Sequence, residues 1–207
     1  DPYNEVFRML DRKEIPASIG QTFGSAEAII VLPSFEEGEI FQGYRQFANS
    51  LIEKGNVKKT ILNDSKTNLP SSLSLWVFGK NNEMQKILVS HLNKLGIVLE
   101  AEGFRLNEGF FSFKEHSFVF TIPRFENEKG TLTWLIASSK DVTPGLIRKL
   151  PHYGKYGYLV FKGDAPENVV KGIWPSTPIN LQKIFKKGNF SLPTQSPLVS
   201  FQSFGDN

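Results

Sequence analysis

Patterns typical of buried strands and of amphipathic helices alternate along the first half of the chain, and this alternation constrains the fold more than any other feature. Residues 26–32 (AEAIIVL) and 73–78 (LSLWVF) are short, continuous apolar runs, as expected of strands covered on both faces. Residues 39–54 and 82–95 place apolar side chains every three or four positions, and each run is followed by a glycine. Strands and helices in this order predict an α/β fold.

Further patterns add strands to the same core. We expect strands at residues 57–62, 131–137 and 156–161, and a short helix at residues 144–150. The aromatic-rich residues 104–113 and 117–122 predict a β-hairpin or two short adjacent strands. The expected architecture is a three-layer αβα fold with a doubly wound, mostly parallel sheet of about six strands and an antiparallel hairpin insertion.

The 207 residues divide into three predicted segments. Residues 1–24 form a lead-in segment docked on the core, and residues 25–162 form a Rossmann-like core. Residues 163–207 contain many prolines and glycines, which predicts an irregular C-terminal extension packed on the core. The chain begins at Asp1 without an initiator methionine or a signal peptide, so we expect a mature protein or a portion of a longer one.

Composition argues against several kinds of site. The chain has no cysteine, and its three histidines, His91, His116 and His152, lie far apart without an HExxH pattern. A G-x-S-x-G nucleophile motif is also missing. The net charge of +3 comes from 24 basic and 21 acidic residues that are interspersed, which disfavours nucleic-acid binding, and no apolar run is long enough to span a membrane. We therefore expect no catalytic residues, no metal and no cofactor in this chain.

The loops after the first and third strands differ in their capacity to bind an anion. Residues 33–38 contain one glycine and two acidic residues, which would repel a phosphate. Residues 79–82 (GKNN) place a glycine and a lysine before a helix, so they could hold an anion weakly, but a tight turn with an asparagine cap is the favoured interpretation.

Aromatic and cationic side chains are concentrated between Leu150 and Pro175. Such residues provide large contact areas with polar tips, which favours a binding surface. The alternative is a helix-to-strand turn with aromatic packing beneath a long C-terminal loop. Strand alternation predicts that Tyr156 and Tyr158 share one face. The predicted binding residues are His152, Tyr153, Lys155, Tyr156, Lys171 and Trp174.

Four sequence segments carry a resemblance to a known family. They are DPYNEVFRMLDRKEIPASIGQTFG at residues 1–24, LWVFGKNN at 75–82, RKLPHYGKYGYLVFKGDAPENVVKGIWP at 148–175, and SPL at 196–198. Together they resemble the C-terminal accessory region of secreted bacterial metallopeptidases of the aminopeptidase N-like, gluzincin type. The resemblance implies that a separate zinc domain with an HExxH helix performs peptide hydrolysis, and that no catalytic residue transfers to this chain.

Three functions follow as expectations. The first is a non-catalytic accessory or interaction domain of a larger exported peptidase, periplasmic or secreted, whose partner is the catalytic domain of the same parent chain. The second is a small hydrolase or transferase with a site at the C-terminal edge of the sheet, near Gly79, Asn81, Asn82, Lys140 and Asp141. The third is a module that binds sugar or peptidoglycan fragments through Tyr153, Tyr156, Tyr158 and Trp174.

Overall fold

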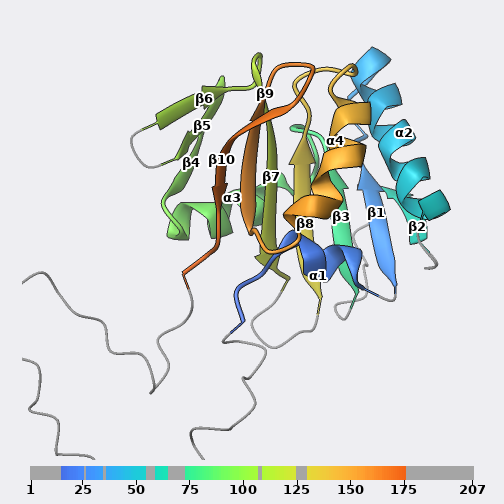
Figure 1. Cartoon of the computed structure of the whole chain (residues 1–207), viewed down its shortest axis with the longest axis horizontal. Coiled ribbons are helices and arrows are strands. Elements are labelled where there is room, and N and C mark those ends of the chain that lie inside the picture. The colour runs from blue at the N-terminus through green and yellow to red at the C-terminus, as the bar shows by residue number, and fades with distance from the viewer. Residues whose placement is uncertain are drawn as a thin grey trace, which may run out of the picture. The chain divides into compact units, whose positions relative to one another are not determined.

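The computed structural model describes residues 15–25, 27–34, 36–54, 59–64, 73–106, 109–124 and 130–175. Helices and strands follow one another in the order shown in Figure 1. The elements are α1 (Ile19–Phe23), β1 (Ala28–Leu32), α2 (Gly38–Lys54), β2 (Lys59–Asn63), β3 (Ser74–Phe78), α3 (Gln85–Lys94), β4 (Ile97–Glu100), β5 (Gly103–Leu106), β6 (Gly109–Ser112), β7 (His116–Pro123), β8 (Thr131–Ile136), α4 (Thr143–Lys149), the 3₁₀ helix η2 (Leu150–Tyr153), β9 (Tyr158–Lys162) and β10 (Glu167–Gly172).

A mixed sheet of seven strands forms the centre of the described structure, in the order β10-β9-β7-β8-β3-β1-β2. The strands β2, β1, β3 and β8 are parallel neighbours. The remaining junctions, β8 with β7, β7 with β9 and β9 with β10, are antiparallel. The predicted α/β class is confirmed, but this sheet has seven strands instead of about six, and only one half of it is parallel.

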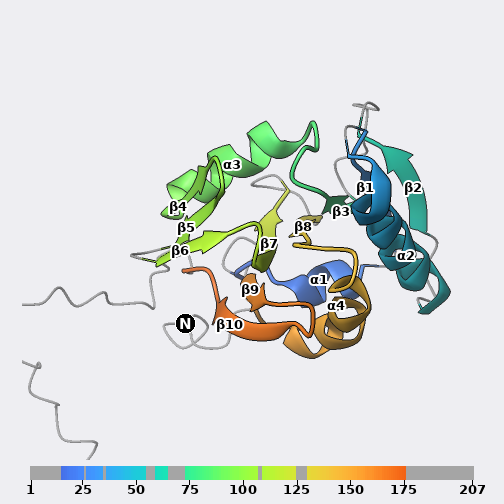
Figure 2. The same cartoon turned by 90° about the horizontal axis from the view of Figure 1, so that it is seen from above.

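Two hydrophobic clusters cover the two faces of this sheet, because neighbouring residues of a strand point to opposite faces. One cluster joins Trp76 and alternate residues of the central strands to α1, α2 and α4. The other joins Trp134 and the intervening residues to α3 and to strands β4 and β5. Figure 2 shows α3 and the small sheet on one side of the large sheet and α1 and α4 on the other. Both tryptophans are fully buried.

The antiparallel insertion is present, but its pairing differs from the prediction. Strands β4, β5 and β6 form a separate three-stranded sheet, in which β5 pairs with both neighbours. Strand β7, which we expected to pair with residues 104–113, instead joins the large sheet between β8 and β9. Phe118, Phe120 and Ile122 are buried on one face of β7 and Val119 on the other, so this strand needs cover on both faces.

The predicted boundary at residue 163 does not mark the end of regular structure. Residues 167–172 form β10, which pairs with β9 and shifts its register between Asn168 and Val170. This bulge interrupts the alternation of side chains, and the glycines and prolines around it suggested a loop. Residues 176–207, including the SPL segment, and residues 1–14 of the lead-in segment lie outside the described residues.

Phe104 is the centre of the aromatic packing between the small and the large sheet. Its ring centroid lies 5.0 Å from those of Phe118 and Phe120, 5.5 Å from that of Phe113 and 5.7 Å from that of Trp134. All of these separations fall in the range of favourable ring contacts. The buried ring of Phe104 therefore fixes the insertion to the sheet.

We expect Phe104→Ala to lower the free energy of unfolding by about 3–5 kcal/mol, because it leaves a cavity between the two sheets. Phe110 on β6, whose side chain is 43% exposed, offers a matched control. Phe110→Ala should cost less than about 1 kcal/mol. Urea denaturation of the two variants measures the difference, and equal losses would contradict this account of the insertion.

Candidate functional site

The turn between η2 and β9, residues 154–157, is bonded to three other parts of the chain. The backbone N–H groups of Ile19 and Gly20 in α1 donate to the carbonyl oxygens of Tyr156 and Gly154, at 3.0 and 2.8 Å. Gly157 accepts from the N–H of Thr121 in β7 at 2.7 Å and donates to the carbonyl of Gly172 in β10 at 2.8 Å. The turn therefore presents its side chains from a fixed backbone.

The two tyrosines that flank Gly157 lie against opposite faces of the sheet, so the prediction of a shared face is wrong. Tyr158 is in β9 and packs against the cluster that contains Trp134. Tyr156 packs against the cluster that contains Trp76. It precedes the strand in a turn closed by its own N–H, which donates to the carbonyl of Tyr153 at 3.0 Å, so strand alternation does not govern it.

Two lysine ammonium groups converge on the ring of Tyr156. The Nζ atoms of Lys155 and Lys171 lie 5.2 and 5.6 Å from its centroid, within the range of cation–π attraction. Tyr153 extends the aromatic surface, since its centroid is 5.9 Å from that of Tyr156. Both lysines are exposed, and neither forms an ion pair within the described part of the chain. The structure thus brings together four of the six predicted binding residues.

The other two predicted residues differ from these four. His152 is exposed on η2. Trp174 is only 6% exposed, and its indole N–H donates to the carbonyl oxygen of Thr121. Its ring lies 4.7 Å from that of Tyr158 and occupies the space where a side chain at Gly157 would be. Trp174 is therefore a buried side chain that anchors β10 and the turn to β7.

At the C-terminal edge of the parallel strands, several of the protein's own polar side chains form hydrogen bonds between loops. Asn82 is buried and donates to the carbonyl of Phe78 at 3.0 Å. Asp64 is also buried and accepts from the backbone N–H groups of Ser34 and Glu83, both at 3.0 Å. The carboxylate of Glu36 accepts from the N–H of Asn81 at 2.9 Å. These cross-loop bonds were not predicted, because sequence spacing does not show which loops meet.

The structure also places two other residues expected at this edge, Lys140 and Asp141. Lys140 forms an ion pair with Glu39 of α2 at 3.4 Å, and Asp141 is exposed at the start of α4. A pocket of about 470 Å³ lies nearby, beside β1, β2 and the start of α2. Its ionisable lining consists of Glu36, Glu37 and Arg45. None of the residues predicted for a hydrolase or transferase site lines this pocket.

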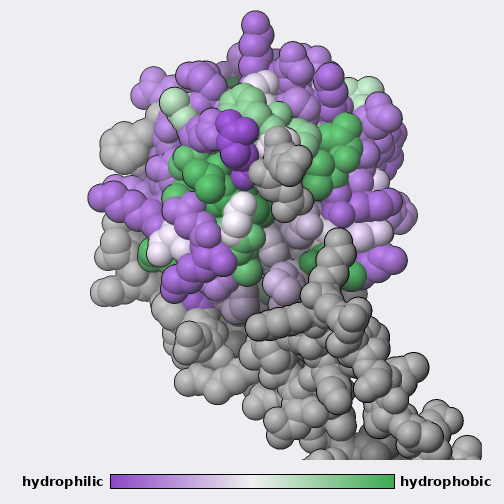
Figure 3. All heavy atoms as spheres, turned by 90° about the vertical axis from the view of Figure 1, so that its left-hand side faces the viewer, coloured by the Kyte–Doolittle hydropathy of each residue, from purple (hydrophilic) through white to green (hydrophobic). Residues whose placement is uncertain are grey.

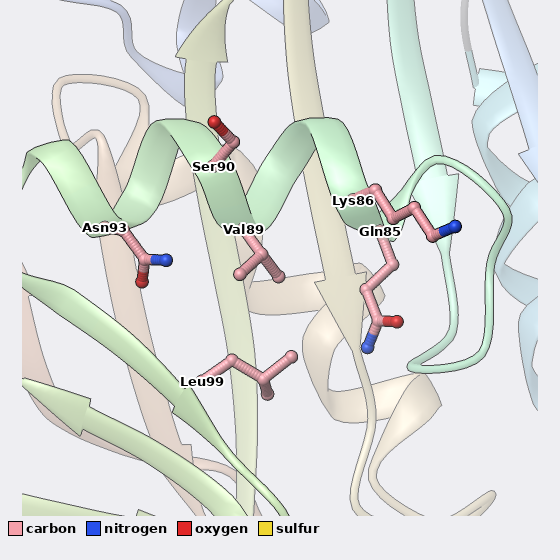
Figure 4. A pocket seen from close by; sticks show the side chains of 6 residues that line it. All are labelled: Gln85, Lys86, Val89, Ser90, Asn93 and Leu99. Carbon is pink, nitrogen blue, oxygen red and sulfur yellow. The ribbon is translucent and has the colours of Figure 1, made fainter.

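A second pocket, of about 480 Å³, lies between α3 and β4. Figure 4 shows Val89 and Leu99 facing each other across it, with Gln85 and Asn93 toward its two ends and Ser90 pointing away. Its centre is therefore apolar. Lys86 is the ionisable residue of this lining, which contains no carboxylate, imidazole or cysteine.

The small sheet presents a mixed outer surface. Val98, Arg105 and Phe110 are cross-strand neighbours there. The Arg105 guanidinium lies 5.8 Å from the ring centroid of Phe110 and bonds the Glu100 carboxylate at 2.6 Å. Figure 3, which shows the side where the small sheet and β10 lie, has hydrophobic residues in the middle surrounded by hydrophilic ones. In contrast to the lysines beside Tyr156, the arginine here has an acidic partner.

The three histidines lie on separate elements, α3, β7 and η2. A search of the described residues found no group of three histidine, cysteine or acidic side chains that could hold a metal ion. His116 bonds the backbone carbonyl of Ser112 through Nδ1 at 3.2 Å. His91 is partly buried, and burial followed by the positive charge of Lys94 lowers its pKa from the ordinary value of 6.5.

No helix within the described ranges is both long and apolar enough to cross a membrane. Comparison with known proteins found no protein-family model that matches the chain, and no match among curated proteins.

We expect Trp174→Phe to lower the free energy of unfolding by about 1–2 kcal/mol, because the buried carbonyl of Thr121 loses its donor. Ile173→Ala is the matched control, since the neighbouring Ile173 is 53% exposed, and it should change stability by less than about 0.5 kcal/mol. Thermal denaturation measures both variants. A neutral Trp174→Phe substitution would show that the indole bond is not structural.

The pKa of His91 also makes stability depend on pH. Because folding lowers this pKa, the unfolded chain binds the proton more readily, and the contribution of His91 to stability is lost as the pH falls below about 6.5. An NMR titration should place the midpoint of the His91 ring below 6.5, and His91→Gln should reduce the loss of stability between about pH 7 and pH 5. A midpoint at or above the ordinary value would contradict the burial described here.

Proposed function

We propose that this chain is a non-catalytic accessory domain of a larger exported peptidase and docks on an acidic surface of the catalytic domain. The observation that carries the proposal is the pair of exposed ammonium groups, of Lys155 and Lys171, around the ring of Tyr156. Tyr156 lies on a turn that α1, β7 and β10 hold in place. We call Tyr153, Lys155, Tyr156 and Lys171 the tyrosine–lysine surface. It has the composition of an interface: aromatic anchors with a charged rim.

The charges of this surface determine the chemistry of its partner. Two ammonium groups near one ring, without an ion pair in the described part of the chain, favour an anionic partner. A carboxylate of the partner would satisfy both, while Tyr153 and Tyr156 contribute apolar contact area. An acidic protein surface therefore fits better than a neutral sugar.

The resemblance of residues 1–24, 75–82 and 148–175 to peptidase accessory regions supports the same proposal. The described parts of the first and last segments meet in the structure, where α1 bonds the turn of residues 154–157. We also propose that the domain is a doubly wound, three-layer fold of the Rossmann type. Two covered sheet faces and the parallel strands β2, β1, β3 and β8 support this description. Export to the periplasm or the exterior belongs to the same proposal.

The competing functions have less structural support. A sugar-binding platform needs several aromatic faces on one surface, but Tyr158 and Trp174 pack against the other face of the sheet. A hydrolase or transferase site at the C-terminal edge needs free polar groups. There, Asn82, Glu36 and Asp64 are engaged in bonds between loops.

The proposal is tested by expressing the catalytic region of the parent chain separately and measuring its affinity for this domain by titration calorimetry. Lys155→Ala combined with Lys171→Ala should weaken binding about tenfold or more, because two charge-assisted contacts are lost. Raising the salt concentration should weaken the wild-type complex more than the variant complex.

Lys86→Ala combined with Lys94→Ala is the matched control. Both lysines are exposed on α3, which covers the opposite face of the large sheet, and their removal changes the net charge equally. This control should bind like the wild type. Equal weakening by both pairs would show only a general charge effect, and a parent chain without a zinc-binding catalytic region would refute the proposal.

A further inference from the structure

A carboxylate of the protein itself joins the loops that follow β1 and β3. Glu36, in the loop after β1, places its carboxylate against the loop after β3, where Oε1 accepts the backbone N–H of Asn81 at 2.9 Å. A Cβ atom at Gly79 would lie 2.8 Å from Glu36 Oε2. The missing side chain of Gly79 thus gives the carboxylate the close approach to backbone that glycine gives to bound anions.

Glycine is required at position 79 for a second reason. Its φ of +88° lies in the left-handed region, which other residues adopt only with strain. The sequence had suggested that residues 79–82 could hold an anion. Lys80 takes no part in the contact with Glu36, because its ammonium group lies over the ring of Phe113, 4.8 Å from the centroid. The backbone alone forms the cradle.

Two other backbone donors of these loops are also bonded to a carboxylate. Asp64, which follows β2, accepts the N–H of Ser34 and the N–H of Glu83, and its Oδ1 also accepts the hydroxyl of Ser34. The donors thus come from the loops after β1 and β3, on either side of the position where the chain reverses its winding direction. In open α/β sheets this position is where ligands bind. The negative charge of Glu36 also contributes, after burial, to the raised pKa of Tyr44 in α2.

We propose that Glu36 is a built-in occupant of this anion position, so that the native protein takes up no small carboxylate or phosphate there. A variant without the Glu36 carboxylate exposes the Asn81 N–H beside Gly79 and binds such an anion. This inference concerns a different part of the molecule from the tyrosine–lysine surface and does not depend on it.

The test follows the backbone amide signal of Asn81 by NMR in the full chain while sodium acetate or inorganic phosphate is added, against sodium chloride at equal ionic strength. Glu36→Ala and Glu36→Ser should each show a saturable shift in the millimolar range and a rise in Tm of about 2–4 °C with saturating anion. Two truncations are used so that poor folding of one leaves the other to decide.

Glu37→Ala is the matched control, because Glu37 is the exposed neighbour in the same loop and lines the same pocket. It removes the same charge and leaves the contact between Glu36 and Asn81 in place. The wild type and this control should show no saturable shift. A saturable shift in either of them, or none in both Glu36 truncations, would overturn the inference.

Discussion

The central strands of the large sheet bury both of their faces, and this constraint determines where the other elements lie. Strands β1, β3 and β8 are buried along their whole length, so apolar side chains point alternately into the two clusters. Each face must therefore be covered. Three helices cover one face, while a single helix and the small sheet cover the other.

This cover requires distant parts of the chain to meet at one place. The turn at residues 154–157 bonds α1, β7 and β10, and Trp174 packs beside it. Because the turn is fixed on several sides, the backbone that carries Tyr156 is held in place. A preorganised surface loses less conformational freedom on binding.

The parts of the fold set by local pattern could be predicted from the sequence. Continuous apolar runs identified β1, β3 and β8, and three- and four-residue spacing identified α2 and α3. Strand pairing could not be predicted in the same way, because the partners of β7, which are β8 and β9, follow it later in the chain and are not indicated by any local pattern. The bulge in β10 interrupts the alternation of side chains by which a strand is identified, and β4 is too short to give a clear pattern.

Local composition indicated which residues form the candidate site, but it did not indicate how their side chains are oriented. The composition of residues 150–175 identified a cluster of aromatic and cationic residues, and four of them do converge. Their orientation depends on the turn before β9, which reverses the direction expected for Tyr156. The role of Glu36 depends on contacts between two loops, Asn81 being 45 positions away, so no local signal indicated it.

The two proposals give one account of the molecule: Glu36 occupies the anion position between the loops after β1 and β3, and a partner binds the tyrosine–lysine surface. Hydrogen exchange followed by mass spectrometry, comparing the isolated domain with the intact parent protein, tests this account most directly. The account predicts added protection at residues 148–156 and 167–173 in the parent and none at residues 36–45. Protection confined to another part of the described structure, with residues 148–156 unchanged, would contradict it.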